Sequence, residues 1–299
     1  MLRIGTRRSV LALAQARSVA ELLEAVGAPA ALVPIATGGD AGVGRADAGP
    51  AGRKGSFVRE IVSALLRGDV DLAVHSAKDL PAEDPEGVLT AAVPERADPL
   101  DVLVTREADL EEGAAVGTSS LRRRYQVLRW RRDLRVIDLR GNVDTRLRRL
   151  ADGDVDGLLL AAAGLARLGL SPDHARPMPV EHMVPAPGQG ALAVQVRADD
   201  VAAAEIVRSL DHPSSRAAFD AERAVVRALG ADCALPLGVY AVVGSDGVRV
   251  RASVVGDGGT AAEADVTAGA PAPAAEAAVA ALLEAGAGPL LAAGREGLT

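Results

Sequence analysis

Residues 117–149 read GTSSLRRRYQVLRWRRDLRVIDLRGNVDTRLRR and predict two strand-to-helix turns in succession. In the first turn, Gly117 and the three hydroxyl residues after it favour a helix start, because hydroxyl oxygens cap helix N-termini. A short strand follows over 135–139, and Arg140-Gly141-Asn142 then opens a second helix. Strand, turn and helix keep alternating in this way along most of the chain. The alternation predicts an α/β fold with mainly parallel sheets.

The same stretch carries a concentrated positive charge. It holds eleven arginines, three aspartates and no lysine, a net of +8 in a chain of formal net charge −7, so the rest of the chain sums to −15. Arg122 and Arg123 fall in the first turn of the first helix, where the helix dipole disfavours cations unless an anion is present, and Arg146 lies one or two turns into the second helix. Guanidinium groups bind carboxylate and phosphate in bidentate fashion. The stretch therefore predicts a site for small anions or polyanions, with a solvated basic helix face as the alternative.

Length and composition limit the class of protein. A chain of 299 residues with 49% apolar and 24% charged side chains is typical of a globular protein of two or three domains. No window contains the ~18 apolar residues that a membrane span needs, and the polar residues that interrupt the N-terminal apolar run argue against a signal peptide there. The single cysteine, Cys233, excludes an internal disulfide, and the four scattered histidines lack metal-ligand spacing. We expect a cytoplasmic protein without metal. The acidic remainder and the 2% aromatic content argue against nucleic-acid binding.

Periodicity and turn residues place the other elements. A Gly/Ala-rich loop over 38–55 is either a mobile flap or a surface loop without a task. The Pro/Gly-rich run 183–190 is interpreted as an interdomain crossing. The remaining elements are expected as strands over 2–6, 31–37, 70–75, 191–197, 239–243, 248–255 and 264–267, and helices over 10–26, 56–66 and 214–229, with a final alanine-rich helix.

Individual residues also draw attention. Lys54 and Lys78 are the only lysines in the chain. Lys78 and Asp79 follow a buried strand at its C-terminal end, where open α/β sheets place their ligand residues. The alternative for Asp79 is a turn-capping aspartate before Leu80-Pro81. A lone cysteine such as Cys233 is most often a small buried hydrophobe, although its predicted loop favours exposure.

Eight motifs, in order along residues 3–240, resemble the porphobilinogen deaminase (hydroxymethylbilane synthase) family. They are RIGTRRSVLAL from Arg3, GRKGSFVRE from Gly52, DLAVHSAKDLP from Asp71, GTSSLRRR from Gly117, LRGNVDTRL from Leu139, AAAGLARLGL from Ala161, PAPGQGALAV from Pro185 and ADCALPLG around Cys233. Each motif alone is weak, but their combination is specific.

The resemblance implies a fold and a domain organisation. Two α/β lobes would resemble type II periplasmic binding protein domains, with a small α+β domain after them. Domain 1 would comprise 1–94 and 191–210, with the flap loop over 38–55. Domain 2 would comprise 95–190, and domain 3 would comprise 211–299 with the cofactor-attachment loop.

The resemblance also implies an activity. Members of the family are transferases of tetrapyrrole (haem and porphyrin) biosynthesis that carry a covalent dipyrromethane cofactor, held through a thioether to one cysteine, here Cys233. They condense four porphobilinogen molecules head to tail with loss of ammonia and release hydroxymethylbilane. Loss of ammonia leaves a cationic methylene-pyrrole, so a fixed carboxylate would stabilise the transition state and relay protons. Asp79 is expected in this catalytic role.

Matching the family motifs residue by residue assigns binding roles. The growing chain of pyrroles carries two carboxylates per ring, a charge that a cleft must compensate. The residues implied to bind the cofactor are Cys233, Lys78, Thr118, Ser120, Arg122 and Arg123. The residues implied to bind substrate are Arg7, Ser9, Lys54, Ser76, Arg140, Arg146 and Arg167. The arginines outside the matched set are expected to be solvated or structural: Arg129, Arg131, Arg132, Arg148 and Arg149.

Some positions depart from the family pattern. Ala231 and Asp232 stand where glycines commonly precede the cysteine, and Asp232 should disfavour the thiolate. Gly38 and Pro50 stand where flap arginine and lysine are common.

The resemblance further implies a monomer that passes its product to uroporphyrinogen-III synthase. The competing hypothesis from another class is a cytoplasmic two-lobed module that binds or senses small anions.

Overall fold

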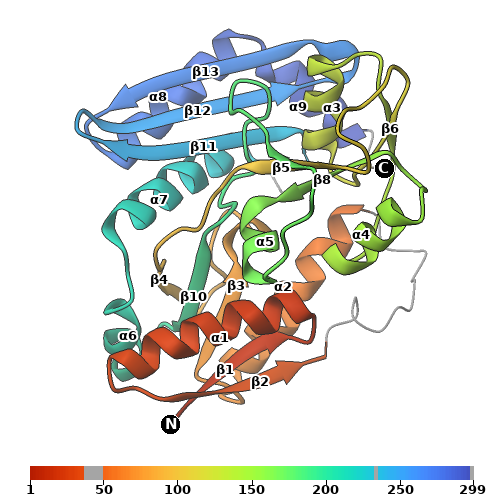
Figure 1. The fold of residues 1–299 in the computed structure, drawn as a ribbon. Helices are drawn as coiled ribbons and strands as arrows, with labels where there is room; N and C mark the ends of the chain where they lie inside the picture. The colour runs from red at the N-terminus through yellow and green to blue at the C-terminus, as the bar shows by residue number, and fades with distance from the viewer. Residues whose placement is uncertain (37–49, 232–234, 297–299) are drawn as a thin grey trace.

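The computed structural model describes residues 1–36, 50–231 and 235–296, and gives the backbone alone for residues 50–57 and 296. Three β-sheets organise the described residues. Figure 1 shows the three-stranded sheet lying across one end of the molecule, with the N-terminal helix α1 at the opposite end.

The first sheet has the strand order β2-β1-β3-β10-β4. Successive residues of β3 point to opposite faces, as they must in a strand. Leu72 and Val74 pack with α1 and α6, whereas Ala73 packs with α2, so helices cover both faces. The elements are β1 (Leu2–Arg7), β2 (Ala30–Ile35), β3 (Leu72–Ser76), β4 (Val88–Ala92), β10 (Leu192–Arg197), α1 (Val10–Ala25), α2 (Pro50–Leu66) and α6 (Val201–Arg208).

The second sheet has the order β7-β6-β8-β5-β9 and the same two-sided construction. Along β8, Leu158 and Leu160 pack with α4 and α5, while Leu159 packs with α3 on the other face. The elements are β5 (Asp101–Thr105), β6 (Ala115–Gly117), β7 (Arg135–Ile137), β8 (Gly157–Ala161), β9 (Ala175–Pro177), α3 (Leu121–Trp130), α4 (Val143–Ala151) and α5 (Ala162–Arg167).

The third sheet is an antiparallel meander, β11-β12-β13, packed against α7, α8 and α9. Small side chains fill this core, which is built largely from alanine, valine and leucine. The elements are β11 (Leu237–Gly244), β12 (Gly247–Val255), β13 (Ala261–Ala268), α7 (Pro213–Ala228), α8 (Pro271–Glu284) and α9 (Ala287–Glu296). Within the described part of the chain no single helix is long and apolar enough to cross a membrane, although α8 and α9, bent by 85°, pass that test as a pair.

Two crossing segments, residues 93–100 and 184–191, connect the first sheet with the second. They run close together, because the Ala97 N–H donates to the Gly190 carbonyl at 3.3 Å. A Cβ added to Gly190, whose φ is +87°, would lie 2.4 Å from the Ala97 oxygen, so only glycine fits this close approach. The Pro/Gly-rich run 183–190, interpreted from the sequence as an interdomain crossing, thus lies between the last strand of the second sheet and β10 of the first.

Glu222 of α7 joins the crossing segments to the third sheet. Its carboxylate is completely buried and accepts from Arg96 Nη1 at 2.7 Å, from the Gly188 N–H at 2.6 Å and from the Ala241 N–H at 2.7 Å. One side chain thus bonds to both crossing segments and to β11. A buried carboxylate with this many donors is fully compensated.

Three expectations about elements were wrong. The first two sheets are mixed, not mainly parallel, because β10 runs antiparallel to β3 and β4, and β5 runs antiparallel to β8 and β9. Helix α2 begins at Pro50 instead of near Ser56, so the end of the predicted flap is helical, while its residues 37–49 lie outside the described part. The final alanine-rich segment forms two helices, which a turn at Gly286 with φ of +90° separates.

Candidate active site

The turn after β3 presents Lys78 and Asp79 in a short 3-10 helix, η1 (Ala77–Asp79). The turn is held in place from two directions. The Ala77 N–H donates to the Ala191 carbonyl at 3.0 Å, and the Leu80 N–H closes the turn on the Ala77 carbonyl at 3.2 Å. Gly188 packs so closely that an added Cβ would lie 2.9 Å from the Ala77 carbonyl carbon. The second crossing segment therefore supports the turn that carries both residues.

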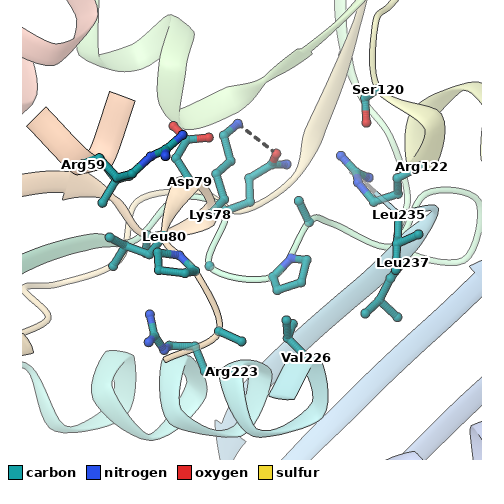
Figure 2. A pocket seen from close by; sticks show the side chains of 18 of the residues that line it. Arg59, Lys78, Asp79, Leu80, Ser120, Arg122, Arg223, Val226, Leu235 and Leu237 are labelled. Atoms are coloured by element: carbon teal, nitrogen blue, oxygen red, sulfur yellow. Dashed lines mark hydrogen bonds between the residues drawn. The ribbon is translucent and has the colours of Figure 1, made fainter. Parts of the chain in front are cut away.

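A cavity of about 630 Å³, here called the large cavity, lies above this turn. Figure 2 shows Lys78 and Asp79 on one side of it, Ser120 and Arg122 on another, and Arg223 and Val226 on α7. Leu235 and Leu237 form an apolar part of its wall. Six cationic side chains are among its described lining residues: Arg59, Lys78, Arg122, Arg123, Arg146 and Arg223. Asp79 is the one carboxylate in that described set.

A second cavity of about 410 Å³, here called the small cavity, adjoins the first. Lys78, Arg123, Arg146 and Gly188 line both cavities, so these residues form the boundary between them. The predicted substrate-binding residues that line the small cavity are Arg7, Ser9, Ser76, Arg146 and Arg167. The structure thus brings residues from the first sheet, the second sheet and α4 to one place.

Arg122 and Arg123 lie in the first turn of α3, as the sequence predicted, and an anion lies beside them. That anion is the completely buried Asp101. Its carboxylate accepts from Arg122 Nη1 at 2.7 Å and from Arg123 Nε at 2.8 Å. Ser120 caps the helix by accepting from the Arg123 N–H at 3.5 Å. Burial alone would raise the pKa of Asp101, but the two guanidinium groups outweigh it and hold the pKa well below its ordinary value.

Both arginines also retain donors for a ligand. Arg122 donates to the Val184 carbonyl at 2.8 Å, and Arg123 donates to the Leu159 carbonyl at 2.9 Å. Together with Asp101, these bonds use three of the five N–H groups of each guanidinium, counting partners in the described residues. Each arginine is therefore held in place by bonds to the protein and still has N–H groups that could bind a ligand in the large cavity.

Lys78 has an unusual electrostatic environment. Burial, together with the neighbouring Arg123 and Arg122, lowers the pKa of its ammonium to about 8, against the opposing effect of Asp79 and Asp101. Its Nζ donates to Gln189 Oε1 at 3.3 Å, the contact drawn in Figure 2. A lysine with a pKa near 8 changes charge close to neutral pH, so an anion that binds beside it stabilises the charged form.

Arg146 and Arg167 are partly buried beside the small cavity. Burial lowers the pKa of Arg146, and the neighbouring Arg123 lowers it as well. Burial lowers the pKa of Arg167 to about 10. Arg146 Nε donates to the Gly141 carbonyl at 2.8 Å, and Arg167 Nη2 donates to the Gly190 carbonyl at 2.7 Å. Both cations have lost hydration, which favours binding of a negatively charged ligand.

The serines of the small cavity are already oriented by neighbouring groups. Ser9 caps α1 by accepting from the Ala12 N–H at 3.3 Å. Ser76 accepts from Gln15 Nε2 at 2.7 Å, which leaves its hydroxyl proton for another acceptor.

Four predicted residues lie elsewhere or outside the described part. Arg140 is exposed, pairs with Asp138 at 3.1 Å, and is not among the residues that line the two cavities. Thr118 is buried beneath the turn, where its Oγ1 accepts from the Ser120 N–H at 3.2 Å. Cys233 lies outside the described residues, as does the side chain of Lys54, whose backbone belongs to α2. Leu235, which follows Cys233 closely in sequence, is buried and lines the large cavity.

Sequence reasoning missed several residues of the site. Asp101 is a charged residue at the start of the apolar strand DVLVT, and that contrast was an available signal. Gln189 stands inside the PAPGQG motif but received no role. Arg59 and Arg223 each lie on a helix among polar residues, where nothing in the spacing marks them as cavity residues. Three of the arginines that were expected to be solvated or structural form ion pairs outside the two cavities: Arg129 with Glu263, Arg131 with Asp133, and Arg149 with Asp154.

The fold and the two cavities define an α/β protein whose arginine-rich site is suited to polycarboxylate ligands. Family models match most of the chain. The porphobilinogen deaminase, dipyrromethane cofactor binding domain matches residues 2–205, and the porphobilinogen deaminase C-terminal domain matches residues 217–285. The chain belongs to the porphobilinogen deaminase family, enzymes of tetrapyrrole synthesis that carry a dipyrromethane cofactor.

Individual relatives agree with the family match. The chain is 48% identical over 265 residues to porphobilinogen deaminase from Rubrobacter xylanophilus, covering 86% of this chain and 85% of the relative. It is 46% identical over 273 residues to porphobilinogen deaminase from Thermobifida fusca, covering 89% and 85%. Among solved structures it is similar to the methionine binding protein MetQ, at 12% identity, 70% and 89% coverage and a TM-score of 0.45.

Proposed function

We propose that this chain condenses four porphobilinogen molecules head to tail, with loss of ammonia, and releases hydroxymethylbilane. One observation carries the assignment of residues to this reaction. Asp79 is a lone carboxylate among six cationic side chains, counted over the described lining of the large cavity. Such a cavity suits a ligand that is polyanionic at its periphery and becomes cationic at its reacting carbon.

The cations of the two cavities would bind the acetate and propionate groups of the pyrroles. We assign Arg7, Arg146 and Arg167, with Ser9 and Ser76, to the incoming porphobilinogen, because these residues line the small cavity. Arg140 and Lys54 remain predictions as further substrate-binding residues. Charge-assisted hydrogen bonds to partly buried guanidinium groups fix a carboxylate in position as well as neutralise it.

The donor set of the large cavity fits a dipyrromethane. Lys78, Ser120 and the spare N–H groups of Arg122 and Arg123 would hold its carboxylates. Leu235 and Leu237 offer apolar surface to its rings, and they follow Cys233, the predicted attachment residue, in the sequence. When bound, the dipyrromethane supplies the pyrrole carbon to which the first substrate is joined. Thr118 remains a prediction as a further cofactor-binding residue.

Asp79 acts on the substrate in this proposal. As ammonia leaves, the pyrrole of porphobilinogen becomes positively charged, and a fixed carboxylate beside it lowers the energy of that state. In its acid form the Asp79 side chain delivers a proton to the leaving amine, and the carboxylate so formed takes a proton back after the new C–C bond has formed. Lys78 and the arginines cannot perform this task, because their charge has the sign of the developing cation.

The test of this role is the Asp79→Asn protein. We expect turnover of porphobilinogen to fall by roughly 10²–10⁴-fold, the range that general acid–base catalysis contributes. Asp144→Asn is the matched control, since it removes the same charge from the lining of the small cavity. Its turnover should stay within a few-fold of the wild type. Equal rates for Asp79→Asn and Asp144→Asn would contradict the assignment.

The attachment residue is tested separately by the mass of the intact protein. The wild type should carry an adduct of two pyrrole units, and Cys233→Ser should lack both the adduct and activity. An unmodified wild type that binds porphobilinogen without releasing ammonia would instead support the anion-binding module, which the family membership does not favour.

Further parts of the proposal follow from the arrangement of the sheets. We divide the chain into domain 1 (1–94 and 191–210), domain 2 (95–190) and domain 3 (211–299), since each range holds one sheet. A cytoplasmic location, a monomeric state and handover to uroporphyrinogen-III synthase remain predictions from the sequence.

A further inference from the structure

Gln189 occupies a central position that the reaction described above does not use. It lies in the second crossing segment, is 1% exposed, and lines the large cavity. Its Oε1 accepts from Lys78 Nζ at 3.3 Å, and its Nε2 donates to the Pro99 carbonyl of the first crossing segment at 2.8 Å. Its side chain also contributes to the lowered pKa of Asp101. One amide therefore lies between the lysine of the first sheet and the aspartate that holds the arginine pair.

The backbone around Gln189 is fixed on both sides. Arg96 Nε donates to the Gln189 carbonyl at 2.8 Å, and the neighbouring Gly188 N–H donates to Glu222 at 2.6 Å. On the other side, the Gly190 carbonyl accepts from Arg167 at 2.7 Å. With its backbone and its Nε2 held, the amide oxygen has a defined position. It is therefore a preorganised acceptor for Lys78.

Lys78 needs such an acceptor because its surroundings oppose its charge. Arg122 and Arg123 face it from α3, and Arg146 of α4 lines the same two cavities, as does Arg7 of β1 in the small cavity. The negative groups that face it are Asp79 of η1 and Asp101 of β5. Asp101 is already engaged by both arginines. Burial and repulsion thus bring the pKa of Lys78 down to about 8, close to the pH at which it would become a neutral amine and bind a carboxylate poorly.

We propose that Gln189 is a positioning residue, which keeps Lys78 protonated and aimed at the boundary between the two cavities. It does so with an uncharged oxygen, so it leaves the positive charge of Lys78 available to a substrate or cofactor carboxylate. A glutamate at this position would neutralise that charge, and an alkyl group would not support it. The identity of the bound anion rests on the proposed function, whereas the contact between Gln189 and Lys78 does not.

The chain allows a direct test, because Lys54 and Lys78 are its only lysines. Competitive labelling of the holoenzyme with acetic anhydride across pH, read by peptide mass spectrometry, gives the pKa of each amine separately. In Gln189→Leu we expect the pKa of Lys78 to fall by roughly 1 from its wild-type value, since an acceptor for the charged form is lost. In Gln189→Glu it should rise by a similar amount, since a carboxylate replaces the amide. Lys54 should titrate unchanged in both.

Gln195 offers a matched control, because it is completely buried in β10, bonds to Asp84 and Thr90, and is not among the residues that line the two cavities. Gln195→Leu should lower the melting temperature yet leave the pKa of Lys78 at the wild-type value. For porphobilinogen, Gln189→Leu should raise KM by about tenfold with a smaller change in kcat, the effect of one lost charge-assisted contact. A pKa of Lys78 that is unchanged in both Gln189 variants, or shifted equally by Gln195→Leu, would overturn the proposal.

The two proposals fail in different ways. A wild type without turnover or adduct contradicts the proposed function, while opposite shifts of the Lys78 pKa in the two Gln189 variants would still support the positioning role. Conversely, an active enzyme whose Lys78 titrates independently of Gln189 contradicts the positioning role alone.

Discussion

Arg122 donates two hydrogen bonds to Asp101, at 2.7 and 3.1 Å, across a distance of 21 residues in sequence. The carboxylate is completely buried and the arginine is 4% exposed. Asp101 also binds Arg123, so one negative charge serves two guanidinium groups. The pair of arginines therefore keeps a net positive charge at the cavity wall even though both are engaged. The protein holds these cations in a dry site in advance of any ligand.

Removal of the Asp101 charge should destabilise the protein strongly. In Asp101→Asn we expect the free energy of unfolding to fall by about 3–5 kcal/mol, because two buried guanidinium groups lose their counter-ion. Urea unfolding followed by circular dichroism measures this change. The control is Asp109→Asn, since Asp109 pairs with Arg176 but is 83% exposed, and a change below about 1 kcal/mol is expected there. Equal effects of the two substitutions would refute a structural role for the buried pair.

Two arginines of α4, Arg146 and Arg148, allow a cavity residue to be compared with a surface residue on the same helix. Arg146 lines both cavities, whereas Arg148 is exposed on the same helix. In Arg146→Ala we expect KM for porphobilinogen to rise by about 10-fold to 100-fold, the loss of a hydrogen bond to a charged group. Arg148→Ala should leave KM within about twofold, since only a solvated charge is removed. Steady-state kinetics measures both KM values. A larger increase in KM for Arg148→Ala than for Arg146→Ala would contradict the proposed placement of the substrate.

The burial of His75 leads us to expect that the free energy of unfolding falls in acid. It lies buried in β3, where burial lowers its pKa to about 4 from an ordinary value of 6.5, while Asp79 and Asp84 raise it. Its Nε2 has no hydrogen-bond partner in the part of the chain that is described. The folded state therefore keeps the imidazole neutral, and between pH 6.5 and 4 the unfolded chain binds more protons.

The sign of this effect follows directly. The contribution of His75 is fully present above pH 6.5 and is lost as the pH falls to about 4, a loss of about 3 kcal/mol. In His75→Leu the free energy of unfolding should depend less steeply on pH in this window, by about one proton. Urea unfolding at a series of pH values measures the slope. A variant with the wild-type slope would show that His75 does not titrate as argued.

The sequence predicted those features that local patterns determine. The apolar run over 70–75 located β3, and helix-start chemistry placed Arg122 and Arg123 in the first turn of a helix. The DLAVHSAKDLP motif placed Lys78 and Asp79 at the end of a strand, and the structure has that arrangement.

Features that depend on distant contacts could not be predicted. The insertion of β10 between β3 and β4 makes the first sheet mixed, and no local pattern reveals that neighbour. The partner of Arg122 was hidden for the same reason, because Asp101 belongs to another strand. The start of α2 was missed because Gly52 and Gly55 have low helix propensity, which other parts of the fold override.

Glu222 has a mechanical consequence. Its bonds to Arg96, Gly188 and Ala241 fasten the third sheet to both crossing segments between the first and second sheets. Cys233 closely follows the helix that carries Glu222 in the sequence. The position of the third sheet is therefore fixed relative to the connection between the other two sheets.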